Sequence, residues 1–333
     1  MNSTVDHYTY YRTTGQLSDN LFSGFVVRWI ISCFGILLNS FLIYATIITR
    51  QVDLFPNSLH SVCNKLLAFD SAATILYQLG TFVGAFLMLT GIYFVPLPIC
   101  CHFLQSLPLV GIYCSLITVL FLAIERILMI VFPIWYQYRK IRKIFLLLFF
   151  TCTAFSLLIL QSVYRWVQDE TRITMVVCSN QDCLQGLAGT LHYQLTVALN
   201  GLSIVCYALL WLFLKVKNKL ETNTARKVFK SILAVMLANL FGQTLSGTVR
   251  ILLSVLSVSP AQQSIVLMCM GHFTILIQAH NAPILYIFSE EYRRAFNQIF
   301  ARFFGCETRT VDSHNIRITC VQNRNRLVPM NLR

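Results

Sequence analysis

The chain has 333 residues, of which 56% are hydrophobic and only 12% are charged. A soluble chain carries about a quarter charged residues, so this composition excludes an ordinary soluble protein and indicates a surface that faces lipid. The net charge of +13 does not indicate a nucleic-acid-binding protein, because the cations stand between long apolar runs, as on the cytoplasmic side of membrane proteins.

Long charge-free windows predict seven membrane-spanning helices, since each helical span needs roughly 20 consecutive apolar residues. The windows lie at 29–49, 64–88, 100–131, 144–164, 190–214, 231–249 (the core of a longer span) and 263–287. The predicted fold is therefore an all-α membrane protein, a seven-transmembrane helix bundle over residues 25–288. A polar N-terminal tail precedes it at 1–24.

The Lys and Arg residues predict the orientation of the bundle, because cytoplasmic loops carry an excess of them. The side that holds the N-terminus has five of the 26, namely Arg12, Arg28, Arg165, Arg172 and Arg250. The remaining 21 lie on the other side, so the N-terminus is predicted to be extracellular and the C-terminus cytoplasmic in the cell membrane. Asn2, in the acceptor pattern Asn2-Ser3-Thr4, then lies where N-glycosylation occurs.

The segment 289–304 is predicted to form an amphipathic helix on the inner membrane surface. Its aromatic and aliphatic residues recur at three-and-four spacing, with arginines between them. Cys306 follows and is either a palmitoylation site or a free cytosolic thiol. Residues 305–333 are polar and are predicted to be a disordered cytoplasmic tail.

A charged pair, Glu125 and Arg126, ends the third span. In an arbitrary membrane protein such a pair can be structural, with Arg reaching the headgroups and Glu pairing with it. Together with Ile130, Pro133 and Tyr136, however, the pair resembles the third-span signature of rhodopsin-like G-protein-coupled receptors. The resemblance implies that Glu125 holds Arg126 at rest and that the freed Arg126 meets the G protein. Adjacent residues on a helix point about 100° apart, so the interaction of the pair is predicted to be local and partly solvated.

The seventh span shows a second part of this resemblance. Pro283 and Tyr286 keep the Pro-x-x-Tyr spacing of the family, but the family's Asn before Pro is Ala282 here, and Asn281 stands one place earlier. One residue turns a helix by about 100°. Asn281 is therefore predicted not to face Asp70 of the second span.

Asp70 resembles the family's second-span carboxylate, which binds sodium together with a third-span Ser, here Ser115, and is braced by a first-span Asn, here Asn39. A carboxylate at membrane depth is costly unless it is hydrated, paired or bound to an ion. Two interpretations stay open: a sodium site, or a hydrogen-bonded structural carboxylate without an ion. No other cofactor is expected.

The resemblance also implies a disulfide from Cys101 to a cysteine of the second extracellular loop. That loop holds Cys178 and Cys183, and the sequence does not decide between them. Cys100 leaves room for a second bridge.

Four residues are predicted to face a ligand in the outer half of the bundle: Gln105, Tyr113, Arg250 and His272. Arg250 either meets an anionic ligand group or reaches the headgroups, and His272 is either a ligand contact or a packed side chain. Few ionisable groups favour a small, mostly apolar ligand. Pro108 stands where aminergic receptors have Asp, and the seventh span has no Lys for retinal.

The fourth, fifth and sixth spans lack the family's Trp, Pro and Cys-Trp-x-Pro landmarks. The runs Ala123–Arg126 and Ser289–Phe296 resemble nematode serpentine chemoreceptors, in particular the srsx branch. The chain has no catalytic arrangement and no set of residues with metal-ligand spacing, so no enzyme is predicted. The predicted function is a receptor that senses an extracellular small molecule or peptide and activates a heterotrimeric G protein. The alternatives are a seven-helix transporter or ligand-gated channel, or a scaffold that has lost coupling.

Overall fold

The computed structural model describes residues 19–51, 62–132, 136, 141–169, 175–217, 223–256, 260–303, 307–312 and 315–319. The candidate modification sites Asn2 and Cys306 lie outside these residues. The side chain of Arg250 also lies outside the described set, although its backbone belongs to a helix.

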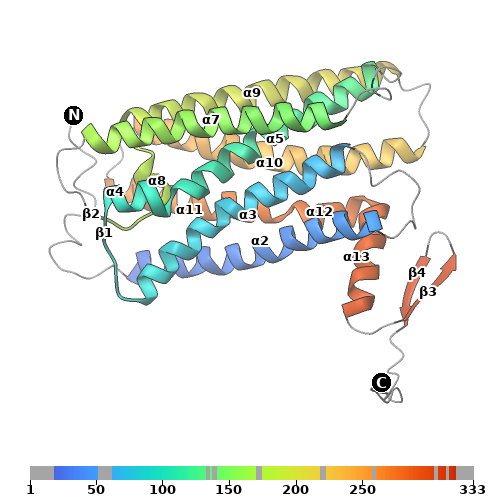
Figure 1. Cartoon of the computed structure of the whole chain (residues 1–333), viewed down its shortest axis with the longest axis horizontal. Helices are drawn as coiled ribbons and strands as arrows, with labels where there is room; N and C mark the ends of the chain where they lie inside the picture. The colour runs from blue at the N-terminus through green and yellow to red at the C-terminus, as the bar shows by residue number, and fades with distance from the viewer. Residues whose placement is uncertain are drawn as a thin grey trace, which may run out of the picture.

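Seven helical rods run side by side in the described part of the chain (Figure 1). They are α2 (Asp19–Gln51), α3 (Val62–Leu89), α5 (Ser106–Val131), α7 (Ile141–Asp169), α9 (Gly186–Lys217), α10 (Asn223–Val255) and a last rod made of α11 (Pro260–Ala279) and α12 (Asn281–Phe288). Within α2, α3, α5, α7 and α9 lie stretches long and apolar enough to cross a membrane. Shorter apolar stretches, Leu233–Val249 and Cys269–Ala279, lie in α10 and α11.

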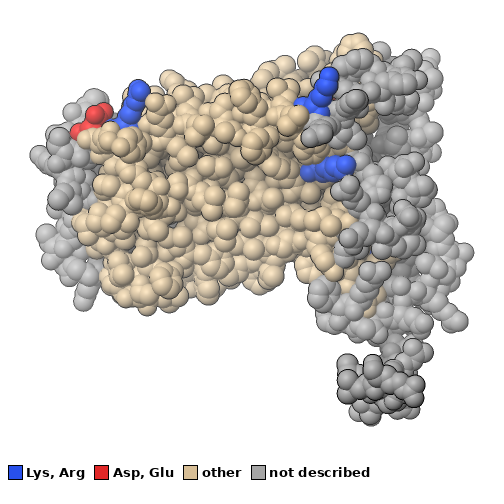
Figure 2. Space-filling view, in the orientation of Figure 1, with Lys and Arg blue, Asp and Glu red and all other residues tan. Residues whose placement is uncertain are grey.

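The rods extend beyond the predicted spans, because a helix continues wherever its backbone bonds are satisfied and does not stop where the apolar run stops. α2, for example, begins at Asp19, ten residues before the first charge-free window. Figure 2 shows where the charged side chains of the described residues lie on one face of the bundle. The middle of this face presents none, and the Lys, Arg, Asp and Glu side chains that are visible lie toward its two ends.

The third predicted span is wrong at its start. The structure divides residues 97–105 into the short helix α4 (Leu97–Ile99) and the π-helical turn η2 (Cys100–Leu104), and α5 starts only at Ser106. Because α5 begins at Ser106, Pro108 lies in its first turn. Backbone N–H groups there have no intrahelical acceptor, so a proline, which lacks the N–H, is tolerated. Apolar composition alone could not show this break.

α5 is the most enclosed of the membrane-length helices: 67% of its apolar window is buried, against 28% in α2 and α7. Its close approach to α3 depends on Gly111. A Cβ at this position would lie 2.6 Å from the backbone nitrogen of Tyr77 and 2.7 Å from the carbonyl oxygen of Ala73. The two helices can therefore touch backbone to backbone, which aligns their polar residues.

One end of the bundle carries the long loop between α7 and α9 (Figure 1). Its strand β2 (Met175–Val176) pairs antiparallel with β1 (Val95–Pro96). The short helix α8 (Asn180–Cys183) follows, and Asp182 accepts hydrogen bonds from the backbone N and the side chain of Ser179, at 2.9 and 3.0 Å. This capping box starts α8.

At the other end, α13 (Glu290–Phe303) turns across the bundle axis (Figure 1). It buries Tyr292, Phe296 and Ile299, and Phe300 stacks on Phe41 of α2 with ring centroids 5.3 Å apart. The amphipathic pattern thus places its apolar face against the protein.

Two described segments beyond α13 differ from the predicted disordered tail. The structure forms an antiparallel hairpin from β3 (Glu307–Asp312) and β4 (Asn315–Thr319). Both segments are rich in β-branched residues, which favour extended backbone even where overall composition is polar.

Candidate functional site

The C-terminal end of α5 holds a buried ion pair. The Nε atom of Arg126 lies 3.4 Å from Oε2 of Glu125, and their side chains are only 7% and 2% exposed. Tyr136 donates a hydrogen bond to the other carboxylate oxygen of Glu125, and Nη1 of Arg126 lies 3.6 Å from the sulfur of Met129. The prediction of a partly solvated pair is therefore wrong, because both side chains are buried in the protein.

The seventh-span residues do not join this pair. The hydroxyl of Tyr286 donates to Oδ1 of Asn297 in α13 at 3.2 Å, and its side chain is 39% exposed. Pro283 lies in the first turn of α12. Tyr286 thus links the last rod to α13 in this conformation and has no described contact with Arg126.

A polar network lies around Asp70, which is fully buried. Ser115 of α5 donates to Oδ1 of Asp70 at 2.7 Å, as the resemblance implied for this pair of positions. Asn281 donates to Oδ2 of Asp70 at 3.3 Å, and Asn239 of α10 donates to Oδ1 of Asn281 at 3.0 Å. The carboxylate thereby joins α3, α5 and α12, and Asn281 extends the network to α10.

The prediction that Asn281 does not face Asp70 is wrong. The last rod is interrupted at His280, whose N–H bonds the carbonyl of Ile277, three residues back, at 3.1 Å. Such a bond tightens the helix locally, and Pro283 removes a further donor. The angle of about 100° per residue does not apply across this break, so Asn281 turns inward.

Asn39, the third predicted member of the network, has other partners. Its side-chain nitrogen donates to the carbonyl oxygens of Gly35 at 2.9 Å and of Gln278 at 3.4 Å. Asn39 therefore ties α2 to α11 and makes no described hydrogen bond to Asp70. A sodium ion at Asp70 would take oxygen ligands from Asp70 and Ser115, and this remains a prediction.

A cavity of about 130 Å³ lies between the helices at the end of the bundle that carries the loop between α7 and α9, and Asn180 and Gln181 of α8 belong to its lining. Most of its lining residues are polar or carry a polar atom: Arg28, Tyr77, Asn180, Gln181, His192, Tyr193, Thr196, Gln243, Ser246, Thr274 and Gln278. Ile112, Leu116 and Leu184 are its larger apolar residues. Polar and apolar atoms both line the cavity, so the expectation of a small, mostly apolar ligand stays a prediction.

None of the predicted ligand contacts whose side chains are described lines this cavity. The hydroxyl of Tyr113 lies behind the wall and shares a hydrogen bond of 2.5 Å with Nδ1 of His192. Gln105 lines a smaller neighbouring hollow and donates to the carbonyl of Cys178 at 3.2 Å. Nε2 of His272 bonds the carbonyl of Gly24 at 2.7 Å, so His272 is a packed residue that joins α11 to α2.

Sequence reasoning missed several lining residues. Gln243 and Gln278 could have been noticed as amides inside apolar spans. In the sequence, Arg28 precedes the first charge-free window and therefore serves only as one of the basic residues on the side of the N-terminus. The structure places it inside α2.

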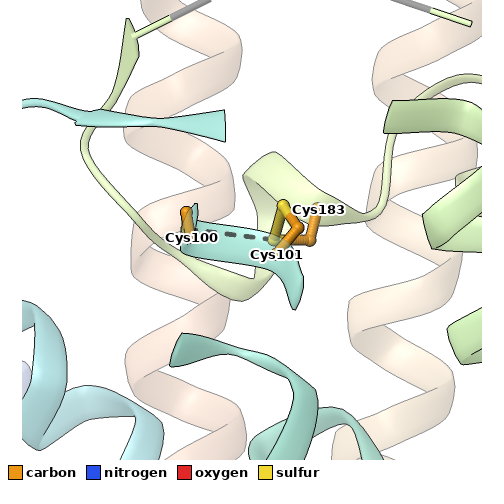
Figure 3. A group of neighbouring side chains, drawn as sticks. All are labelled: Cys100, Cys101 and Cys183. Carbon is orange, nitrogen blue, oxygen red and sulfur yellow. Dashed lines mark hydrogen bonds between the residues drawn. A yellow bond between two sulfur atoms is a disulfide. The ribbon is translucent and has the colours of Figure 1, made fainter. Parts of the chain in front are cut away.

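Two disulfides hold the loop over the cavity. Cys101 is bonded to Cys183 and Cys100 to Cys178. Figure 3 shows the first bond with Cys100 beside it, and the sulfur of Cys100 lies 3.9 Å from that of Cys183. Three cysteine sulfurs gather here, but a cysteine binds a metal as a free thiolate, which the disulfides exclude.

Comparison with known families agrees with this architecture. A family model described as "Serpentine type 7TM GPCR chemoreceptor Srsx" matches residues 32–300, which include all seven rods in whole or in part. Among curated proteins, none matches the chain.

Proposed function

The chain belongs to the Srsx family of serpentine seven-transmembrane chemoreceptors, and we propose that it binds a small extracellular molecule in the outer cavity and activates a heterotrimeric G protein at its inner end. The family match favours a receptor over a transporter or channel.

The buried Glu125–Arg126 pair is the observation that carries the proposal. Burying two opposite charges costs desolvation energy that their attraction only partly offsets, so such a pair adds little stability. It can, however, distinguish two packings of the bundle if only one of them keeps the pair closed. Tyr136 adds a second contact to the closed arrangement.

α5 connects the cavity to this pair. Ile112 and Leu116 line the cavity, Ser115 bonds Asp70, and Glu125 and Arg126 follow toward the inner end. A ligand that moves α5 relative to its neighbours would therefore act on the polar network and on the ion pair through one rigid helix. The equilibrium shifts only as far as the ligand binds one packing better than the other.

The proposed orientation can be tested with epitopes. We expect an epitope before Asn2 to be labelled by antibody on intact cells, and one after Arg333 only after permeabilisation, because 21 of the 26 basic residues lie on the side of the C-terminus. Labelling in the reverse order would contradict the receptor proposal, since the G protein is cytoplasmic.

G-protein coupling can be tested without a ligand through Tyr136. Tyr136→Phe removes the hydrogen bond to Glu125, and a hydrogen bond to a charged group contributes about 1.5–3 kcal/mol. We expect basal nucleotide exchange on at least one class of Gα subunit to rise about tenfold in membranes that contain equal amounts of receptor.

The control is Tyr164→Phe, which removes the same hydroxyl from an exposed tyrosine on α7. It should leave basal exchange unchanged. Equal exchange for wild type, Tyr136→Phe and receptor-free membranes with every Gα class would refute coupling.

A further inference from the structure

Arg28 is a half-buried cation in the seam between α2 and α11. A Cβ added to Gly271 of α11 would lie 3.6 Å from Nη1 and 3.7 Å from Cζ of Arg28. The flat guanidinium thus lies against the α11 backbone where no side chain intervenes. Arg28 lines both the cavity and the smaller hollow beside Gln105.

This cation has no counter-charge among the described residues. The described residues that line the cavity include no acidic residue, and the ion pair between described residues is the one at Glu125 and Arg126. The nearby loop helix holds Asp182, whose carboxylate accepts from Ser179. The Nε atom of Arg28 is buried and has no described hydrogen-bond partner.

The other walls of the cavity offer neutral polar groups. Gln243 and Ser246 come from α10, and Thr274 and Gln278 from α11. The Oε1 atom of Gln278 is buried without a described partner. Unpaired buried polar atoms are costly, and an unpaired cation costs more. Among the described lining residues, the guanidinium of Arg28 is surrounded by neutral donors and acceptors, and this arrangement fits a ligand with one negative charge.

We propose that the cavity binds a small organic monoanion whose carboxylate pairs with Arg28. The planar guanidinium presents paired N–H donors that match the two oxygens of a carboxylate. The remainder of the ligand lies between Ile112, Leu116 and the neutral amides. This inference rests on the proposed function, since it takes the cavity to be the ligand site, but it concerns binding and not coupling.

The test measures thermal unfolding of the full-length protein purified in detergent, without a G protein. The probes are butanoate, hexanoate and benzoate, each compared with its primary amide, which has nearly the same shape but no charge. We expect at least one carboxylate to raise the melting temperature by about 2–4 °C at saturation. The matching amide should need at least a tenfold higher concentration for the same rise.

Two variants of Arg28 and one control complete the design. Arg28→Gln should remove the preference for the carboxylate, whereas Arg28→Lys should keep the preference at about tenfold weaker binding, which remains informative if Arg28→Gln does not fold. Arg165→Gln removes an exposed cation on α7 and should leave the response unchanged.

The proposal is overturned if no carboxylate raises the melting temperature, if the amides act equally, or if Arg28→Lys responds to carboxylate and amide alike. It is also overturned if a folded Arg28→Gln keeps the wild-type response. A protein that binds carboxylates through Arg28 but drives no nucleotide exchange would uphold this inference and refute the proposed coupling.

Discussion

Arg126→Ala is expected to abolish ligand-driven nucleotide exchange while the receptor remains at the cell surface. The substitution removes the cation proposed to meet the G protein. It leaves Glu125 with the hydrogen bond from Tyr136. We expect at least a hundredfold loss of agonist-stimulated GTPγS binding at matched surface expression.

Glu125→Gln should have the opposite effect on basal activity. Arg126 stays charged at any physiological pH, so the closed packing then holds an unpaired buried cation. Removing one partner of a buried pair costs roughly 3–5 kcal/mol, and even a third of that shifts a two-state equilibrium about tenfold. Basal exchange should therefore rise about tenfold or more.

Lys143→Ala is the matched control for both variants. Lys143 is an exposed cation at the same end of the bundle, on α7, and its loss should change exchange by less than about threefold. An Arg126→Ala receptor with normal surface level and wild-type exchange would show that the pair is only structural.

Cys101→Ala should cause the second large effect, a loss of most surface expression and of ligand response. The bond to Cys183 closes a loop with a sequence separation of 82 residues and holds α8 over the cavity. Loss of a native disulfide typically costs about 2–5 kcal/mol. Cys183→Ala should reproduce the loss, whereas Cys114→Ala, on the reduced part of α5, should change neither quantity.

Cys100 offers Cys183 an alternative disulfide partner, because its sulfur lies 3.9 Å from that of Cys183. In Cys101→Ala, Cys100 can pair with Cys183 and release Cys178 as a thiol that a maleimide would label. The double variant of Cys100 and Cys101 lacks this rescue and should express least. A free Cys101 in peptide maps of the unreduced wild type would contradict the assigned pairing.

The features that depend on local composition could be predicted from the amino-acid sequence. Apolar runs of membrane length predict seven spans, because the thickness of the hydrocarbon core sets their length. The three-and-four spacing after the last span predicts the amphipathic α13, since helix geometry maps spacing onto faces. Family motifs supplied the Asp70–Ser115 contact and the presence of a disulfide at Cys101.

Only the tertiary structure decided which side chains meet. Asn281 reaches Asp70 because the last rod is broken at His280, and one local break rotates every later side chain about the axis. Cys101 meets Cys183 and not Cys178 because β2 and α8 fix the path of the loop.

The residues that line the cavity also follow from the tertiary structure. Arg28 lines it because α2 continues outward past the apolar window and Gly271 leaves space for the guanidinium. Length and hydropathy place a residue along a helix, whereas its direction around the axis and its neighbours depend on breaks, glycine contacts and loop paths. Such breaks, contacts and loop paths depend on residues far apart in the chain, so they could not be predicted from a single sequence.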